Sequence, residues 1–216
     1  MSRQYHLKEL EIARDPNDRR RAMPSFSNHH RILDVGCGAG QTLIAANLSE
    51  GVEAYGVDPD PEAIKLGQEI CPPFIKLSQA SGEKLPFPDA YFDLVFSRVA
   101  LPYMHIGKGL SEMWRVLQPD GVLWLALHPR KMALREFTSA VRKGLPKLAV
   151  FRTYVLVNGF VFNTFGTQFA CPVLRRQETY QTVKGITRAL ERAFFTPTAI
   201  QTQEHFIVEA RKDAKK

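Results

Sequence analysis

The sequence predicts an α/β fold built on a doubly wound, mostly parallel sheet. A short apolar run at 30–33 leads through Asp34 into closely spaced glycines, and residues 41–48 then show helical spacing. Further short apolar runs alternate with helical segments along the chain, which is typical of parallel sheets. The chain has 216 residues and no repeat or low-complexity tract, so it is long enough to bury one α/β core.

The turn after the first predicted strand is the leading candidate for a binding site. Residues 34–40 read DVGCGAG. Glycines allow unusual backbone angles and let a ligand approach the main chain, with a helix N-terminus behind the turn. Dinucleotide-binding turns space their glycines as G-x-G-x-x-G, whereas here the third glycine is Gly40 and Gln41 follows it, which argues against NAD. A structural turn without a ligand is the alternative interpretation.

The segment from Asp34 to Gly40 resembles the first motif of the class I S-adenosylmethionine-dependent methyltransferases, in which an acidic residue precedes G-x-G-x-G. The resemblance to this family, and to its small-molecule type, covers most of residues 28–129 and resumes near 182. It implies a Rossmann-like sheet of about seven strands that ends in an antiparallel hairpin strand. It also implies S-adenosyl-L-methionine as cofactor and S-adenosyl-L-homocysteine as product.

The run 52–57 predicts a second strand that ends at Asp58, about twenty residues after the glycines, where an acidic side chain can bind both ribose hydroxyls. The alternative role of Asp58 is to cap the helix that starts within 59–62, and the two roles are compatible. The run 74–77 predicts the third strand.

Residues 81–88 and 92–97 resemble the adenine loop and fourth strand of the family. Relatives usually open this loop with an aspartate that holds the adenine amino group, but this chain has Ser81. A serine accepts a hydrogen bond without the charge that strengthens it, so Glu83 is an alternative partner. The segment 97–103 lacks the Asn/Asp-Pro-Pro-aromatic motif of nucleobase amino methyltransferases, which favours small-molecule acceptors.

The resemblance implies a donor site formed by the glycine turn, the end of the second strand, the adenine loop and the end of the fourth strand. Its residues are Asp34, Gly36, Cys37, Gly38, Gly40, Asp58, Pro59, Ser81, Gly82, Glu83, Ser97 and Arg98. The sulfonium of the donor already activates the methyl group, so no catalytic residue is obligatory. A weakly acidic acceptor would benefit from a general base, for which His105 and His128 are the candidates; each has a capping or packing role as its alternative.

Residues 112–117 predict a helix end, 118–121 a turn and 122–127 a fifth strand, and 198–201 with 206–210 predict a terminal hairpin. We expect one methyltransferase domain over 1–216. Its parts are an N-terminal helical extension (1–29), a donor-binding core (30–129), a cap or substrate insertion (130–181) and a final helix with hairpin (182–216).

The insertion should lie over the carboxyl edge of the sheet, where ligands bind in open α/β folds. Its apolar residues recur at helical spacing over 133–141, and 144–146 ends that helix. The stretch is basic, with a single acid, Glu136, and the tail 211–216 adds to a formal net charge of +7. The cations of the stretch are Arg130, Lys131, Arg135, Arg142, Lys143, Lys147 and Arg152. Such a surface favours nucleic acid, anionic lipid or an acidic substrate, unless it is only a solvated face.

The stretch 148–165 is rich in Val and Phe, but polar residues such as Arg152 and Asn158 interrupt it, so we expect no transmembrane segment. One interpretation is a cap that packs its aromatics into the core. Another is a pocket for an apolar acceptor, and a third is contact with a membrane surface. The aromatic residues of that pocket would be Phe160, Phe162, Phe165 and Phe169.

The cysteines are Cys37, Cys71 and Cys171; they are odd in number and lack metal-ligand spacing, so neither a disulfide framework nor a metal site is expected. We expect a cytoplasmic enzyme without an export signal. It would methylate a small, partly apolar acceptor. RNA or protein substrates, a non-catalytic S-adenosylmethionine-binding module and, more remotely, a nicotinamide dehydrogenase are the alternatives.

Overall fold

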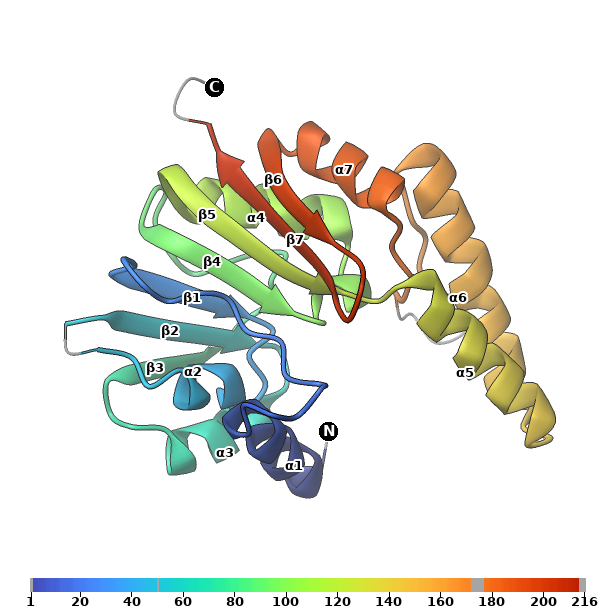
Figure 1. Ribbon diagram of the computed structural model, residues 1–216, viewed down its shortest axis with the longest axis horizontal. Helices are drawn as coiled ribbons and strands as arrows, with labels where there is room; N and C mark the ends of the chain where they lie inside the picture. Colours follow the sequence, from blue (N-terminus) through green and yellow to red (C-terminus); the bar gives the residue numbers. More distant parts are fainter. Residues whose placement is uncertain (1, 50, 172–176, 214–216) are drawn as a thin grey trace.

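The computed structural model describes residues 2–49, 51–171 and 177–213 (Figure 1). The last three residues of the basic tail, 214–216, lie outside the described residues. A single seven-stranded sheet runs through the molecule in the order β3-β2-β1-β4-β5-β7-β6. The strands are β1 (Arg31–Val35), β2 (Glu53–Asp58), β3 (Ile75–Gln79), β4 (Phe92–Arg98), β5 (Leu117–Leu127), β6 (Phe195–Gln201) and β7 (Phe206–Lys212).

Strands β1 to β5 pair in parallel, and β7 is antiparallel to both β5 and β6. This confirms the predicted Rossmann-like sheet with its antiparallel C-terminal hairpin strand. The apolar run of β1 is buried on both faces of the sheet: Leu33 and Val35 contribute to one core cluster and Ile32 to another. Burial on both faces explains why the sequence of this strand is continuously apolar rather than alternating.

Helices cover the two faces of the sheet (Figure 1). α1 (Arg3–Arg14), α2 (Gln41–Ala45) and α3 (Pro61–Ile70) lie on one side. The short η1 (Leu101–Tyr103), α4 (Ile106–Val116) and α7 (Val183–Arg192) lie on the other. The sheet's carboxyl edge therefore stays open between the two helical layers, as expected of a doubly wound fold.

Two boundaries differ from the sequence-based expectation. The predicted turn 118–121 lies inside β5, and Asp120 in this stretch has a positive φ of 62°. Helix α2 ends at Ala45 instead of continuing to residue 48, and the next positive φ, at Asn47, turns the chain toward β2. Local turn residues, rather than the apolar pattern, set both boundaries.

After β5 the chain forms a two-helix hairpin of α5 (Arg130–Arg142) and α6 (Pro146–Phe165), which projects from the end of the sheet (Figure 1). The apolar stretch 148–165, which contains polar residues such as Arg152 and Asn158, lies within the single continuous helix α6. Pro146 starts it at a position where no backbone N–H is required, and Gly166 ends it in the left-handed conformation. Within the part of the chain that the structure describes, α6 alone is long and apolar enough to cross a membrane, judged by length and composition.

Candidate functional site

A cavity of about 560 Å³ opens at the carboxyl ends of β1, β2 and β4, within the size range of ligand pockets. The glycine turn, the end of β2 and residues 81–83 form its inner part. The chain after β4, His128 after β5 and Met132 of α5 form its outer part. Helix α1 contributes Tyr5, His6 and Glu9.

The glycine turn adopts a conformation that only glycine tolerates at its first position. Gly36 has a φ of +80°, and a Cβ there would lie 2.1 Å from the Cβ of Ala100. Gly38 also has a positive φ, of 56°. The conformational freedom of these residues brings the main chain to the cavity wall.

The backbone N–H groups of this turn all donate within the protein. Those of Gly36 and Cys37 donate to the carbonyl of Val57, at 2.8 and 3.0 Å. The N–H of Gly38 donates to the Asp58 carboxylate at 2.9 Å. Those of Ala39 and Gly40 donate to the Gln41 side chain and the Cys37 carbonyl. A dinucleotide turn must present such groups to a pyrophosphate, so this arrangement fits a ligand without phosphate.

Asp58 connects the turn to the start of α3. One carboxylate oxygen accepts the Gly38 N–H and the other accepts the N–H of Asp60 at 2.9 Å. The N-cap of α3 is Asp60, whose carboxylate accepts the Glu62 N–H. Asp58 therefore precedes the cap rather than forming it, and it lines the cavity beside Pro59.

Asp34 is a buried carboxyl group at the bottom of the cavity. It is 2% exposed, and its Oδ1 atom has no hydrogen-bond partner. Burial raises the pKa of Asp34 to about 8; the positive charge of Arg98 acts against this shift, and Asp58 adds to it. An unpaired carboxyl oxygen at a cavity wall fits a ligand that brings a positive charge or a hydrogen-bond donor.

The structure places most of the predicted donor-site residues on the cavity wall. These are Asp34, Gly36, Cys37, Gly38, Asp58, Pro59, Ser81, Gly82, Glu83 and Arg98. Gly40 and Ser97 do not line it. Gly40 is the N-cap of α2, where a Cβ would lie 2.8 Å from Cys71 Sγ. Ser97 is fully buried and its hydroxyl donates to the Val35 carbonyl, so it connects β4 to β1 instead.

The loop that begins at Ser81, predicted from the sequence to hold the adenine, uses its polar groups partly for its own structure. The Ser81 hydroxyl accepts the Glu83 N–H at 3.1 Å, which fixes the turn. One carboxylate oxygen of Glu83 accepts the His105 N–H at 2.9 Å. Both side chains still face the cavity.

The two candidate bases separate in the structure. His105 is the N-cap of α4, with its Nδ1 accepting the Lys108 N–H, and it lies outside the cavity lining. His128 lines the cavity with its ring edge against Tyr103, the ring centroids being 5.4 Å apart. Burial, and secondarily the positive charge of Arg152, lowers the pKa of His128 to about 4. His128 is therefore an uncharged imidazole near neutral pH, which a general base must be.

Two hydrogen bonds hold the backbone of His128 in place. Its N–H donates to the side-chain oxygen of Gln181 at 3.1 Å, and its carbonyl accepts the Gln181 N–H at 2.8 Å. Gln181 is itself 1% exposed. A residue before α7 thus fixes the position of a histidine after β5, which sequence spacing does not reveal.

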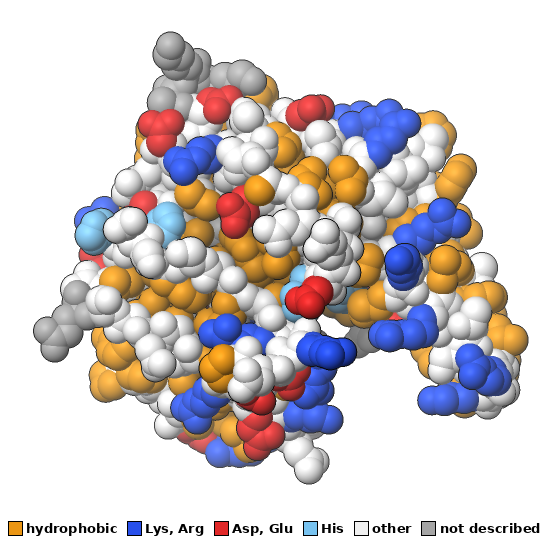
Figure 2. All heavy atoms as spheres, in the orientation of Figure 1, with side chains coloured by type: hydrophobic (Ala, Val, Ile, Leu, Met, Phe, Trp, Pro, Cys, Tyr) orange, Lys and Arg blue, Asp and Glu red, His pale blue; other side chains and the backbone are white. Residues whose placement is uncertain are grey.

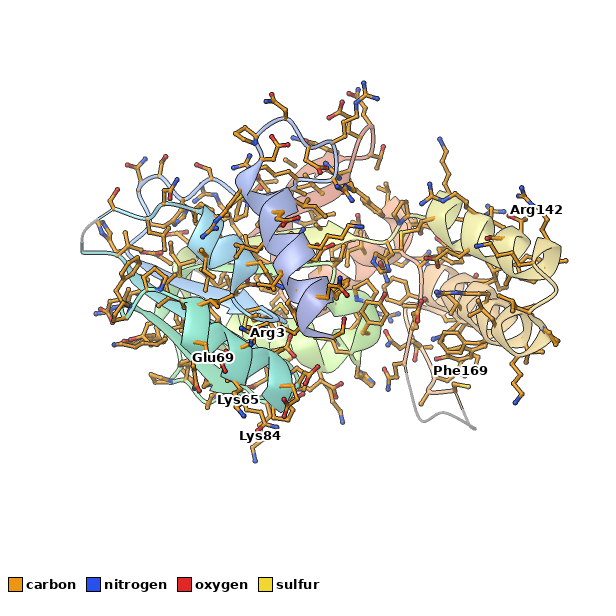
Figure 3. All side chains as sticks on the ribbon, turned by 90° about the horizontal axis from the view of Figure 1, so that it is seen from below. Arg3, Lys65, Glu69, Lys84, Arg142 and Phe169 are labelled. Carbon is orange, nitrogen blue, oxygen red and sulfur yellow. The ribbon has the colours of Figure 1, made fainter. Side chains whose placement is uncertain are left out.

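Sequence reasoning missed the contribution of α1 to the site. Glu9 forms an ion pair with Arg98 at 2.9 Å, with side-chain exposures of 23% and 14%. The side-chain nitrogen of Gln41 lies 2.9 Å from Nδ1 of His6. At the outer edge, Arg3 and Glu69 point toward each other and pair at 2.8 Å (Figure 3). Helix α1 therefore closes one side of the cavity. The signal in the sequence that could have indicated this is the set of apolar residues that α1 buries.

The cavity does not support the alternative of an aromatic pocket in the insertion, because none of the four phenylalanines lines it. Phe160 and Phe165 are 60% and 61% exposed, and Phe169 is 41% exposed. Phe162 is 1% exposed and packs in the main core. Phe160, Phe162 and Phe165 lie on different sides of α6, and Phe169 follows the end of the helix.

A comparison with protein families decides the identity of this core. Residues 33–125 match the family model of the methyltransferase domain. Residues 33–125 form a class I S-adenosylmethionine-dependent methyltransferase domain. The cofactor of the methyltransferase domain is S-adenosylmethionine, and the cavity described above lies against its glycine turn.

Curated relatives agree with this assignment. The uncharacterized methyltransferase YcgJ of Bacillus subtilis is 35% identical over 122 residues, which are 53% of this chain and 47% of the relative. The 2-methyl-6-phytyl-1,4-hydroquinone methyltransferase of Synechocystis is 29% identical over 63% of this chain and 45% of the relative. The tRNA N(3)-cytidine methyltransferase of Danio rerio is 32% identical over 47% of this chain and 33% of the relative. The chain thus spans less than half the length of these relatives.

A solved structure shows the same fold. It is the 1,6-didemethyltoxoflavin-N1-methyltransferase of Burkholderia thailandensis, with bound 1,6-didemethyltoxoflavin and S-adenosylhomocysteine. The TM-score is 0.55 at 20% identity, and the match covers 85% of this chain and 71% of that one.

Proposed function

We propose that this chain transfers a methyl group from S-adenosylmethionine to a small, partly apolar acceptor. The observation that carries the proposal is one continuous cavity with two chemically different ends. The inner end holds Asp34 and Asp58 beside the glycine turn. The outer end is lined by Val99 and Met132 together with the aromatic rings of Tyr103 and His128. A donor and an apolar acceptor in one cavity can meet at close distance.

The donor contacts follow from the same geometry. Asp58 lies at the end of β2, where an acidic side chain binds ribose hydroxyls, and Asp34 offers an unpaired oxygen to the positively charged part of the ligand. When bound, S-adenosylmethionine supplies an activated methyl group on a sulfonium. The chain then has to orient the donor and the acceptor and exclude water. In this proposal His128 accepts a proton from a hydroxyl or an acidic C–H group of the acceptor.

The names of similar proteins support a small acceptor. One curated relative is named for a hydroquinone and the solved structure for 1,6-didemethyltoxoflavin. We also propose the division into an extension (1–29), a donor core (30–129), an insertion (130–181) and a final helix with hairpin (182–216). The proposed setting is the cytoplasm.

An RNA acceptor is the second candidate. The basic insertion favours it, and one relative is named for a tRNA cytidine. RNA binding that neutralises phosphates weakens strongly with added salt. Binding of a small apolar molecule does not, so the salt dependence of acceptor binding separates the two candidates.

Calorimetry with S-adenosylmethionine, S-adenosylhomocysteine and NAD tests the donor assignment. We expect both adenosyl compounds to bind with a Kd of about micromolar order and NAD not to bind. Asp58→Asn should weaken both by roughly tenfold or more, which is about 1.4 kcal/mol. Asp120→Asn is the matched control, because Asp120 lies in the remote turn of β5 at a positive φ that Asn tolerates.

Equal affinity of the Asp58→Asn and wild-type proteins for the donor would contradict the assigned ribose contact. Binding of both adenosyl compounds without turnover of any acceptor tested, small molecule or RNA, would identify the chain as a binding module.

A further inference from the structure

The outward face of α6 is uncharged along its whole length. Six of the exposed residues of α6 recur at intervals of four and three, which places them on one side of the helix, apart from the exposed Lys147, Leu148 and Phe165. They are Pro146, Val150, Thr153, Val157, Phe160 and Thr164, and we call them the α6 stripe. Val150, Val157 and Phe160 are 72%, 49% and 60% exposed. A helix at a protein surface normally presents charged residues on this side.

The opposite side of α6 attaches the helix to the rest of the protein. Val155, Asn158, Gly159 and Phe162 are buried there. The Asn158 side chain donates to the Glu178 carbonyl and accepts the Phe169 N–H. Because these contacts fix the rotation of the helix, the α6 stripe faces outward as a consequence of the fold.

The threonine hydroxyls of the α6 stripe form hydrogen bonds within the helix and do not need water as a partner. The Thr153 hydroxyl donates to the Ala149 carbonyl at 3.0 Å, and the Thr164 hydroxyl donates to the Phe160 carbonyl at 2.9 Å. Each hydroxyl therefore has a partner one helical turn back. Such internally bonded threonines are compatible with a lipid environment, in which every polar group must be satisfied within the protein.

Cations stand at both ends of the stripe. Arg142, Lys143 and Lys147 lie at the tip of the hairpin, where Arg142 is exposed (Figure 3). At the other end, Arg188 and Arg192 of α7 donate to carbonyls of residues 163–166. Figure 2 shows Lys and Arg side chains gathered with apolar ones over the hairpin. The one acid between 129 and 171, Glu136, pairs with Arg152.

From this combination we propose that the α5–α6 hairpin docks on an anionic lipid bilayer, with the α6 stripe in the interface and the flanking cations at the headgroups. A helix of 20 residues is about 30 Å long and can lie in the interface plane with its apolar side immersed. Each cation near an anionic surface adds favourable energy. A second copy of the chain fits less well, because pairing two stripes would bring cationic ends together.

The docked hairpin is joined directly to the site. Helix α5 starts at Arg130, and Met132 in its first turn lines the cavity. The docking proposal itself rests on α5, α6 and α7 and is independent of the proposed donor chemistry.

Co-sedimentation of the full chain with vesicles tests the proposal. We expect the protein to sediment with phosphatidylcholine vesicles that contain phosphatidylglycerol, to remain in solution with phosphatidylcholine alone, and to be released by salt. Phe160→Asp should reduce binding by roughly tenfold or more. Phe74→Asp is the matched control, since Phe74 is 49% exposed but precedes β3.

A charge variant provides the second arm. Arg142→Gln, Lys143→Gln and Lys147→Gln together should weaken vesicle binding by roughly tenfold. The control removes the same charge elsewhere, with Lys8→Gln, Arg14→Gln and Lys65→Gln, and should bind as the wild type does. All these side chains are exposed, so folding is not at stake.

Several outcomes would overturn the proposal. They are no sedimentation with anionic vesicles, equal loss for Phe160→Asp and Phe74→Asp, or a dimer in solution that Phe160→Asp dissociates. Protein that only detergent and not salt removes would show a spanning helix instead. Donor binding by calorimetry is expected to be the same in all variants, so failure of docking and failure of the donor site remain distinguishable.

Discussion

At the scale of single residues, Asp34 couples the donor site to pH. Its pKa is raised to about 8 by burial, above the value near 4 of an unfolded chain. The folded state therefore holds a proton that the unfolded state releases. The resulting stabilisation is complete below pH about 4 and is lost as pH rises through about 8.

We expect Asp34→Asn to remove this dependence. The melting temperature of the ligand-free wild type should fall relative to that of the variant between about pH 5 and pH 8. The difference between the two proteins isolates Asp34, because His128 and the other titrating groups are present in both. Parallel melting curves at every pH would refute the assignment.

His128 makes a second residue-scale prediction. Its pKa of about 4 means that the imidazole is already unprotonated at pH 6, whereas an ordinary histidine titrates near 6.5. Once an acceptor with a hydroxyl or acidic C–H is found, turnover should not fall between pH 7 and about pH 5.5 through this group.

His128→Gln should then lower kcat by about 10²- to 10⁴-fold while leaving the Kd for S-adenosylmethionine unchanged. The matched control is His105→Gln, because His105 caps α4 outside the cavity. Equal effects of the two substitutions on kcat would remove His128 from the mechanism.

At the scale of elements, two ion pairs of different burial attach α1 to the rest of the protein, and one of them lies at the cavity. Glu9 and Arg98 are 23% and 14% exposed, whereas Arg3 and Glu69 are 62% and 48% exposed. Exposed pairs contribute little, and a partly buried hydrogen-bonded pair contributes more.

Glu9→Gln should therefore loosen α1 and weaken donor binding by about five- to tenfold, whereas Glu69→Gln should change it by less than about twofold. Calorimetry measures both affinities, and hydrogen exchange of the α1 amides reports the loosening directly. If the two variants lose donor affinity equally, α1 does not act as a wall of the site through Arg98.

The elements also show how far sequence reasoning reaches. Strands β1 and β2 could be predicted because each is a short apolar run that leads into an acidic residue, Asp34 or Asp58. Helix α6 was not predicted, because Arg152 and Asn158 interrupt the apolar run of 148–165, although both find partners within the fold. Their pairing with distant residues has no local signal.

The site divides in the same way. The glycine turn was predicted from its spacing. Two residues predicted for the site do not line the cavity: Gly40 is the N-cap of α2, and Ser97 in β4 donates its hydroxyl hydrogen bond to β1. The cavity wall formed by α1 and the hydrogen bond between Gln181 and the His128 backbone both depend on tertiary packing, which has no local signal in the sequence.

At the scale of the whole molecule, the hairpin packs on the chain that precedes α7 through a small cluster around Ala133, Val155 and Tyr180. Gly159 is the tight point of this junction, since a Cβ there would lie 2.2 Å from the Tyr180 ring. An added methyl group in a packed core destabilises by about 1–3 kcal/mol.

Gly159→Ala should lower the free energy of unfolding by that amount, about 1–3 kcal/mol, yet leave the affinity for S-adenosylmethionine within about twofold of the wild type. Denaturant unfolding and calorimetry measure the two quantities. Gly107→Ala serves as the control, because its Cβ would meet nothing closer than 3.5 Å and a helical alanine is favourable. A loss of donor affinity in Gly159→Ala alone would mean that the hairpin shapes the donor site, because the added methyl group would meet the Tyr180 ring and neither residue lines the cavity.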